Sequence, residues 1–114
     1  MEEREAQRKR EREEREEQRK REREERQAER ERRKAEEAKQ EKQKKIEYTT
    51  ETIARLKQEI VRENEYYAKK TKLDMYSSND KYASELDDRH YRKLSKLDQE
   101  IDEAEEKLRQ LQGT

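Results

Sequence analysis

Residues 75–80 read MYSSND, the one cluster of turn-forming and helix-capping residue types in the chain. Whether a helix continues through this stretch decides how the residues on either side of it are arranged. Ser77 or Asn79 can cap a new helix, which favours a turn at this point. The stretch has neither Gly nor Pro, so nothing in it forces a helix to stop.

Apolar residues on both sides of this stretch follow helical spacing. From Ile53 to Leu86 they recur in steps of three, four and four, an eleven-residue period that corresponds to about 3.67 residues per turn. From Leu94 onward the spacing is that of a heptad. The stripe keeps its register across residues 75–80, so we expect one continuous helix there. The alternative is a helical hairpin that turns near Ser77–Asp80.

We predict that this stripe binds partner helices. It comprises Ile53, Leu56, Ile60, Asn64, Tyr67, Met75, Tyr82, Leu86, Leu94, Leu97, Ile101, Ala104, Leu108 and Leu111. Asn64 is the polar member of its eleven-residue column. It either fixes the register of a seam as a buried amide or lies in water where the seam is loose.

The composition excludes a compact globular core. Of the 114 residues, 56% are charged and 25% hydrophobic, whereas a globular domain has about 45–50% apolar residues. A disordered chain has a similar composition, but Glu, Arg, Lys, Gln and Ala are strong helix formers and the chain has no Pro. We therefore predict an all-α, extended protein: a long charged single α-helix followed by a coiled-coil or helix-bundle association segment.

Residues 1–45 have no apolar face, with 19 Lys and Arg and 16 Glu among them. The eight-residue block RKREREER occurs at residues 8–15 and again at 19–26, eleven residues later. A helix that is polar on all sides needs support from side-chain pairs three or four residues apart. Seven such pairs have the acid before the base: Glu5–Lys9, Glu11–Arg15, Glu16–Lys20, Glu17–Arg21, Glu22–Arg26, Glu29–Arg33 and Glu41–Lys45.

These short blocks of Glu and Arg or Lys over residues 2–45 resemble the stable single α-helices of some unconventional myosins and of caldesmon. The resemblance is to a type of segment and implies a rigid spacer. The present segment departs from that type in being rich in Arg first and in Lys only after Lys34. Arg-rich tracts of mixed charge also occur in nuclear RNA-processing proteins, which leaves a second class of protein open.

Two regions with different roles follow from these patterns. Residues 1–45 are predicted to be a charged single-helix arm, and residues 46–112 an association segment. We expect a cytoplasmic structural protein that joins an oligomer or a larger complex, of the cytoskeletal or motor-linked kind, through partner helices of its own copies or of another coiled-coil protein. The alternatives are a nuclear mixed-charge protein of an RNA-processing assembly and a helix that binds filaments.

No catalytic, cofactor or metal site is expected, because the chain has one His and no Cys, and an isolated helix offers no pocket. His90 lies between Leu86 and Leu94, so we predict a residue at or beside the seam. Its alternative roles are a pH-sensitive contact and a metal ligand together with Asp87 or Asp88.

Other partner classes have weaker signals. Tyr66, Tyr76 and Tyr91 lie off the stripe and are candidates for a second contact face, or are ordinary exposed tyrosines. Nucleic acid is not expected as a partner, since glutamates flank the basic clusters at residues 8–10, 19–21 and 32–34. Membrane insertion is not expected either, because no apolar run approaches the length of a spanning helix.

Overall fold

The computed structural model describes residues 2–113. These residues form three helices and no strand: α1 (Glu2–Thr71), α2 (Asp74–Ser78) and α3 (Asp80–Gly113). The predicted all-α class is therefore confirmed. The chain divides into two units between Glu41 and Lys42, a few residues before the predicted boundary at 45/46. No helix in the described part of the chain is both long enough and apolar enough to cross a membrane.

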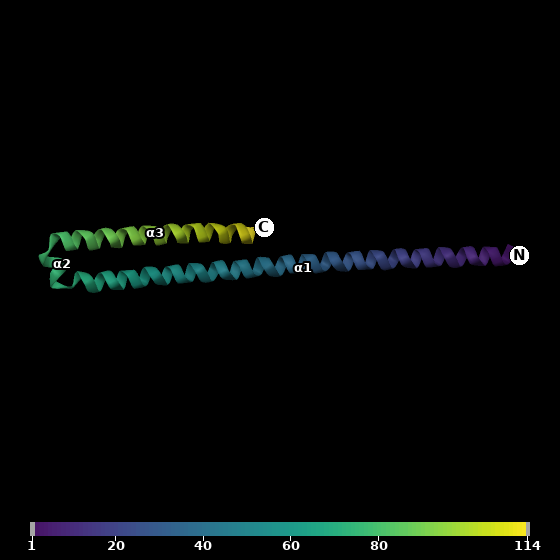
Figure 1. Cartoon of the computed structure of the whole chain (residues 1–114), viewed down its shortest axis with the longest axis horizontal. Coiled ribbons are helices and arrows are strands. Elements are labelled where there is room, and N and C mark those ends of the chain that lie inside the picture. Colours follow the sequence, from purple (N-terminus) through teal and green to yellow (C-terminus); the bar gives the residue numbers. More distant parts are fainter. Residues whose placement is uncertain (1, 114) are drawn as a thin grey trace. The chain divides into compact units, whose positions relative to one another are not determined.

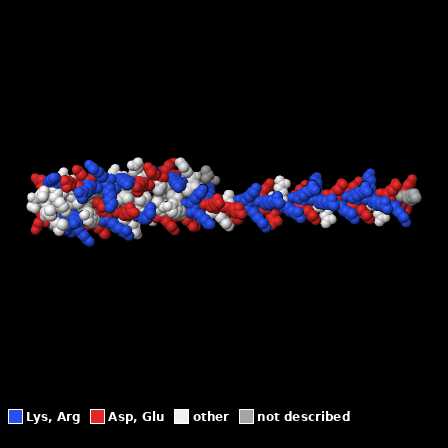
Figure 2. Space-filling model, in the orientation of Figure 1, with Lys and Arg blue, Asp and Glu red and all other residues white. Residues whose placement is uncertain are grey.

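The first unit is the beginning of α1, and it is helical as predicted. Every residue from Glu2 to Glu41 is exposed to solvent. Two of the seven predicted acid-before-base pairs are closed in this unit, Glu17–Arg21 and Glu29–Arg33, each at 3.0 Å. Figure 2 shows Lys and Arg interleaved with Asp and Glu along this part of the helix. Its support is local, between neighbouring turns of one helix.

The second unit is a helical hairpin. The last part of α1, from Lys42 to Thr71, lies beside α3, and α2 joins them (Figure 1). The continuous helix that we expected is interrupted at residues 72–73 and again at Asn79, and the hairpin alternative is the arrangement that forms. The interruption begins before the predicted turn at Ser77–Asp80, since α1 already ends at Thr71.

Local hydrogen bonds explain how the chain turns without Gly or Pro in the turn. The backbone N–H groups of Lys72 and Leu73 donate to carbonyls only three residues earlier, at 3.3 and 3.2 Å, which tightens the end of α1. Asn79 then caps α3, because its side-chain oxygen accepts from the backbone N–H of Tyr82 at 3.1 Å. Ser77 is not a cap: its hydroxyl donates to the carbonyl of Asp74 at 3.0 Å.

The core of the hairpin is a narrow seam between α1 and α3. Leu56 of α1 packs with Leu97 and Ile101 of α3, and the half-buried Ile60 lies against them. The residues of α1 that turn toward α3 are spaced alternately by three and four. They are Thr49, Ile53, Leu56, Ile60, Glu63 and Tyr67. This is heptad spacing, typical of two helices packed side by side, and it replaces the three-four-four spacing that we predicted for this part of the chain.

A run of threonines precedes this seam without breaking α1. The hydroxyls of Thr49, Thr50 and Thr52 each donate to the backbone carbonyl four residues earlier, at 2.7, 2.8 and 2.9 Å. The β-branched side chains thus satisfy their polar groups within the helix. Thr49 can therefore lie buried in the seam with its hydroxyl hydrogen-bonded within α1.

Candidate association surface and polar seam

Most of the predicted stripe lies on the inner side of the hairpin. Five of its members are buried: Ile53, Leu56, Leu86, Leu97 and Ile101. Seven are half-buried: Ile60, Tyr67, Tyr82, Leu94, Ala104, Leu108 and Leu111. The remaining two, Asn64 and Met75, are exposed. The buried members pack within one chain, whereas our prediction concerned partner helices. The half-buried members leave apolar surface along the flanks of the seam.

Asn64 does not lie on the inner side of the hairpin. Its neighbour Glu63 takes the inner position and is only 8% exposed, while Asn64 is in water. The reason is the change of spacing, because three residues after Ile60 brings the chain to residue 63 and four brings it to residue 64. Within the single chain Asn64 is solvated, and its role in a seam with a partner helix stays a prediction.

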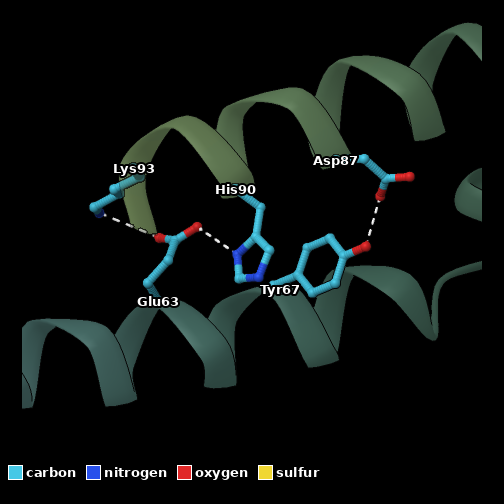
Figure 3. A network of polar contacts seen from close by, with 5 residues as sticks. All are labelled: Glu63, Tyr67, Asp87, His90 and Lys93. Carbon is cyan, nitrogen blue, oxygen red and sulfur yellow. Dashed lines mark hydrogen bonds and ion pairs between the residues drawn. The ribbon is translucent and has the colours of Figure 1, made fainter. Parts of the chain in front are cut away.

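Glu63 is the centre of a polar contact across the seam (Figure 3). One carboxylate oxygen lies 3.2 Å from Nδ1 of His90 and the other 3.2 Å from Nζ of Lys93. An ionised carboxylate only accepts hydrogen bonds, so Nδ1 of His90 carries the proton of this contact. Lys93 reaches Glu63 from the edge of the seam, with 59% of its side chain exposed. Both oxygens of the buried carboxylate therefore have a partner.

His90 lies in the seam, as predicted, with 5% of its surface exposed. The ring of Tyr67 stacks on the His90 ring with 3.8 Å between centroids and 7° between planes. Tyr91 also contacts the His90 ring, in an edge-to-face arrangement with 5.5 Å between centroids. The stacked Tyr67 ring covers the imidazole while Glu63 satisfies one of its nitrogens, which is how a polar ring is accommodated in a narrow helical seam.

Nearer to the turn, two tyrosines converge on Asp87 of α3. The hydroxyl of Tyr67 donates to Oδ1 of Asp87 at 2.6 Å, and that of Tyr76, on α2, donates to the same oxygen at 3.1 Å. The hydrogen bond to Asp87 raises the pKa of Tyr67 well above its ordinary value of 10.0, and the bond with Tyr76 and burial add to the rise. One carboxylate of α3 thus ties together the end of α1 and the connecting α2.

Of the three tyrosines proposed for a second contact face, Tyr76 is therefore used within the hairpin. Tyr66 and Tyr91 remain exposed, at 52% and 64%. Lys70 lies over the ring of Tyr66, with its ammonium nitrogen 5.5 Å from the ring centroid. A common face for the tyrosines is not formed, since one of the three faces inward.

The polar contacts of this seam connect α1 to α3. Within residues 2–113 no group of three or more His, Asp or Glu side chains is arranged to hold a metal ion, so His90 has no such set with Asp87 or Asp88. All buried side-chain nitrogen and oxygen atoms of the described residues have hydrogen-bond partners. A fully satisfied polar cluster can align two helices, because any shift between them leaves a buried group without its partner.

Sequence reasoning missed Glu63 and Asp87 as seam residues. A charged residue is rarely buried unless it is paired, so residue type alone does not assign either of them to the seam. The signal that could have found Glu63 is the heptad continued backward from Tyr67, which places residue 63 on the inner face. Asp87 lies one turn before the predicted seam residue His90, on its face of α3.

Comparison with protein-family models, with curated proteins and with solved structures found no match.

Proposed function

We propose that this protein is a structural spacer that carries a helical hairpin by which it joins a larger assembly. The observation that carries the proposal is the full exposure of residues 2–41 within a continuous helix. No side chain of residues 2–41 is buried, so this part of the helix needs no partner to cover an apolar face. Such a segment can hold the parts at its two ends at a fixed distance and orientation. This role involves no catalysis.

Interleaved charge supports this proposal. Alternating acid and base along the helix allows pairs between neighbouring turns, such as Glu17–Arg21, and leaves little net field to attract nucleic acid or an anionic membrane. Together with the resemblance to the single helices of unconventional myosins and caldesmon, this extends the proposal to a cytoskeletal or motor-linked assembly in the cytoplasm.

The hairpin supplies the attachment in this proposal. Its half-buried residues, Leu94, Leu108 and Leu111 among them, leave apolar surface along the flanks of the seam. We propose that partner helices, from another copy or another coiled-coil protein, cover these flanks as an additional layer. Association of this kind rests on apolar burial, so added salt should not weaken it.

A distance measurement tests the spacer directly. The chain has no Cys, so single cysteines can be placed at the exposed Gln7 and Gln40 and spin-labelled in the full-length protein. A rigid helix with about 1.5 Å rise per residue predicts a narrow distribution near 50 Å for pulsed electron paramagnetic resonance. A flexible chain of that length predicts a broad distribution near about 30 Å. The second outcome would overturn the spacer and favour the mixed-charge interaction tract.

A further inference from the structure

The outward face of α3 changes sign along its length. Its exposed residues, spaced by three and four, form one line on the side opposite the seam. Between Glu85 at its start and Gln110 at its end, the line comprises Arg89, Arg92, Lys96, Gln99, Glu103 and Glu106. In this middle part three basic residues come first, a neutral amide follows, and two acidic residues come last. The helix therefore presents a basic half and an acidic half on one continuous face.

This order makes the face complementary to itself. In two antiparallel copies related by a twofold axis, a residue meets the one that lies equally far on the other side of the midpoint. With the midpoint between residues 97 and 98, Arg89 meets Glu106 of the other copy and Arg92 meets Glu103. Lys96 meets Gln99 at the centre. Each contact occurs twice, because the axis generates its mate.

We propose that this face of α3 binds the same face of a second copy of the chain in antiparallel orientation. The proposal goes beyond the spacer role, and its contacts are between charged side chains, whereas those at the flanks of the seam are apolar. Parallel copies would place like charges opposite each other, so the pattern selects one orientation. A different acidic partner would match only the basic half of the face.

The surface is open to such a partner. Arg89, Arg92 and Lys96 line a groove of about 500 Å³ beside the seam, together with Glu59 of α1 and with Lys93, Leu97 and Glu100 of α3. The acidic end is accessible as well, since Glu103 and Glu106 are both exposed. Glu106 already holds Arg109 of its own helix at 2.8 Å, an exposed pair that can exchange for an intermolecular one at little cost.

The outer face of α1 in the same hairpin provides a contrast. Gln58 lies at its centre, with Arg55 and Arg62 on either side and Glu51 and Glu65 beyond them. All five residues are exposed. Here the residues equally far from the centre have the same sign. An antiparallel pair centred on Gln58 would set Arg against Arg and Glu against Glu, whereas one centred on Ile60 would set Arg55 against Glu65 and Glu51 against Lys69. Charge reversals on each face therefore decide which of the two faces pairs.

The test is a pair of charge reversals in the full-length protein, followed by sedimentation velocity at low ionic strength. Variant A carries Arg89→Glu and Arg92→Glu, and variant B carries Glu103→Arg and Glu106→Arg. Each variant alone has like charges across the twofold axis, so its dissociation constant for self-association should rise at least about tenfold over wild type. An equimolar mixture of A and B should form a one-to-one dimer tighter than the wild-type dimer.

A matched control separates geometry from net charge. Variant C, with Arg55→Glu and Arg62→Glu, has the same charge change as A but on the outer face of α1. It should self-associate as wild type does and should not form the tight one-to-one dimer with B. Circular dichroism of every variant should show that helical content is kept. Self-association of the wild type should also weaken as salt rises from about 0.01 M to about 1 M, where the Debye length falls to about 3 Å.

Three results would overturn the proposal: a wild-type chain that stays monomeric at low salt, variants A or B that associate as wild type does, or a mixture of C and B that dimerises as tightly as A and B. An association that persists at high salt and ignores all these reversals would instead indicate the apolar flanks. That result would remove the charged interface and leave the proposed attachment through partner helices standing.

Discussion

The two units of this protein reach the same secondary structure by different means. In residues 2–41 every side chain is exposed and the observed ion pairs lie within one helix. In the hairpin, α1 is held by contacts with α3, both apolar at Leu56 and polar at Glu63. α1 runs through both units, so the presence of a helix does not by itself show which contacts stabilise it. The comparison shows that a helix can depend on its own neighbours over one stretch and on another helix over the next.

Shortening a side chain in the apolar seam should distinguish the two units most clearly. Leu97 is 5% exposed and packs with Leu56 and Ile101. We expect Leu97→Ala to lower the free energy of unfolding of the hairpin by about 2–5 kcal/mol, through lost burial and the cavity that remains. Chemical denaturation followed by hydrogen exchange should locate the loss in residues 42–113 and leave residues 2–41 unchanged.

Leu73 provides the control for that experiment. It lies in the turn and is 46% exposed, so Leu73→Ala should change stability by no more than about 0.5 kcal/mol. Equal effects of the two substitutions would mean that the seam is not the source of the hairpin's stability.

Removing the carboxylate at the centre of the polar seam should have the next largest effect. Glu63→Ala leaves Nδ1 of the buried His90 without its acceptor, which costs about 1–3 kcal/mol. The loss of Lys93 as a partner adds little, because that ammonium group is already largely in water. Thermal unfolding should show the decrease. The adjacent Asn64→Ala, at an exposed position, should leave the midpoint nearly unchanged, and the reverse ranking would restore Asn64 to the seam.

The raised pKa of Tyr67 predicts a smaller, pH-dependent effect. In the unfolded chain this hydroxyl ionises near pH 10, whereas in the hairpin it keeps its proton to higher pH. The hydrogen bond to Asp87 therefore contributes its full stability below about pH 10, and the contribution declines as pH rises through and above that value. Unfolding measured between about pH 8 and pH 11 should show this decline.

Tyr67→Phe should remove that part of the pH dependence while lowering stability at neutral pH. Tyr66→Phe is the matched control, since Tyr66 is a neighbouring tyrosine whose side chain is exposed. A decline with pH that is the same in wild type and in Tyr67→Phe would show that the contact with Asp87 does not control it.

The smallest expected effect concerns the charged unit. Glu17→Gln removes the ion pair with Arg21, which is fully solvated, so we expect a local loss of about 0.2–0.5 kcal/mol. At low salt, amide hydrogen exchange near residue 17 should be faster in the Glu17→Gln variant than in the wild type. In about 1 M salt the wild type should exchange as fast as the variant, because screening removes the pair in both. A difference that survives high salt would point to support other than charge.

Much of the fold was accessible from the sequence, and the failures share one cause. Helix over the charged residues, the seam position of His90 and the inner placement of most of the stripe follow from residue type and period. The turn and the inner position of Glu63 do not. Both depend on where α3 lies against α1. The apolar residues keep their eleven-residue spacing across the turn, so this spacing does not show where α3 packs.

The sequence by itself determined that this chain is helical and that residues 2–41 form a helix with no apolar face. Those properties arise from helix propensity and from pairs only four residues apart, such as Glu29–Arg33. Only the tertiary structure decided that the chain folds back on itself, that Glu63 and not Asn64 enters the seam, and that Tyr67 and Tyr76 meet on Asp87. The physical reason is distance along the chain. Contacts twenty or more residues apart, such as Tyr67–Asp87 and Glu63–His90, depend on how two surfaces fit together, and no local pattern encodes that fit.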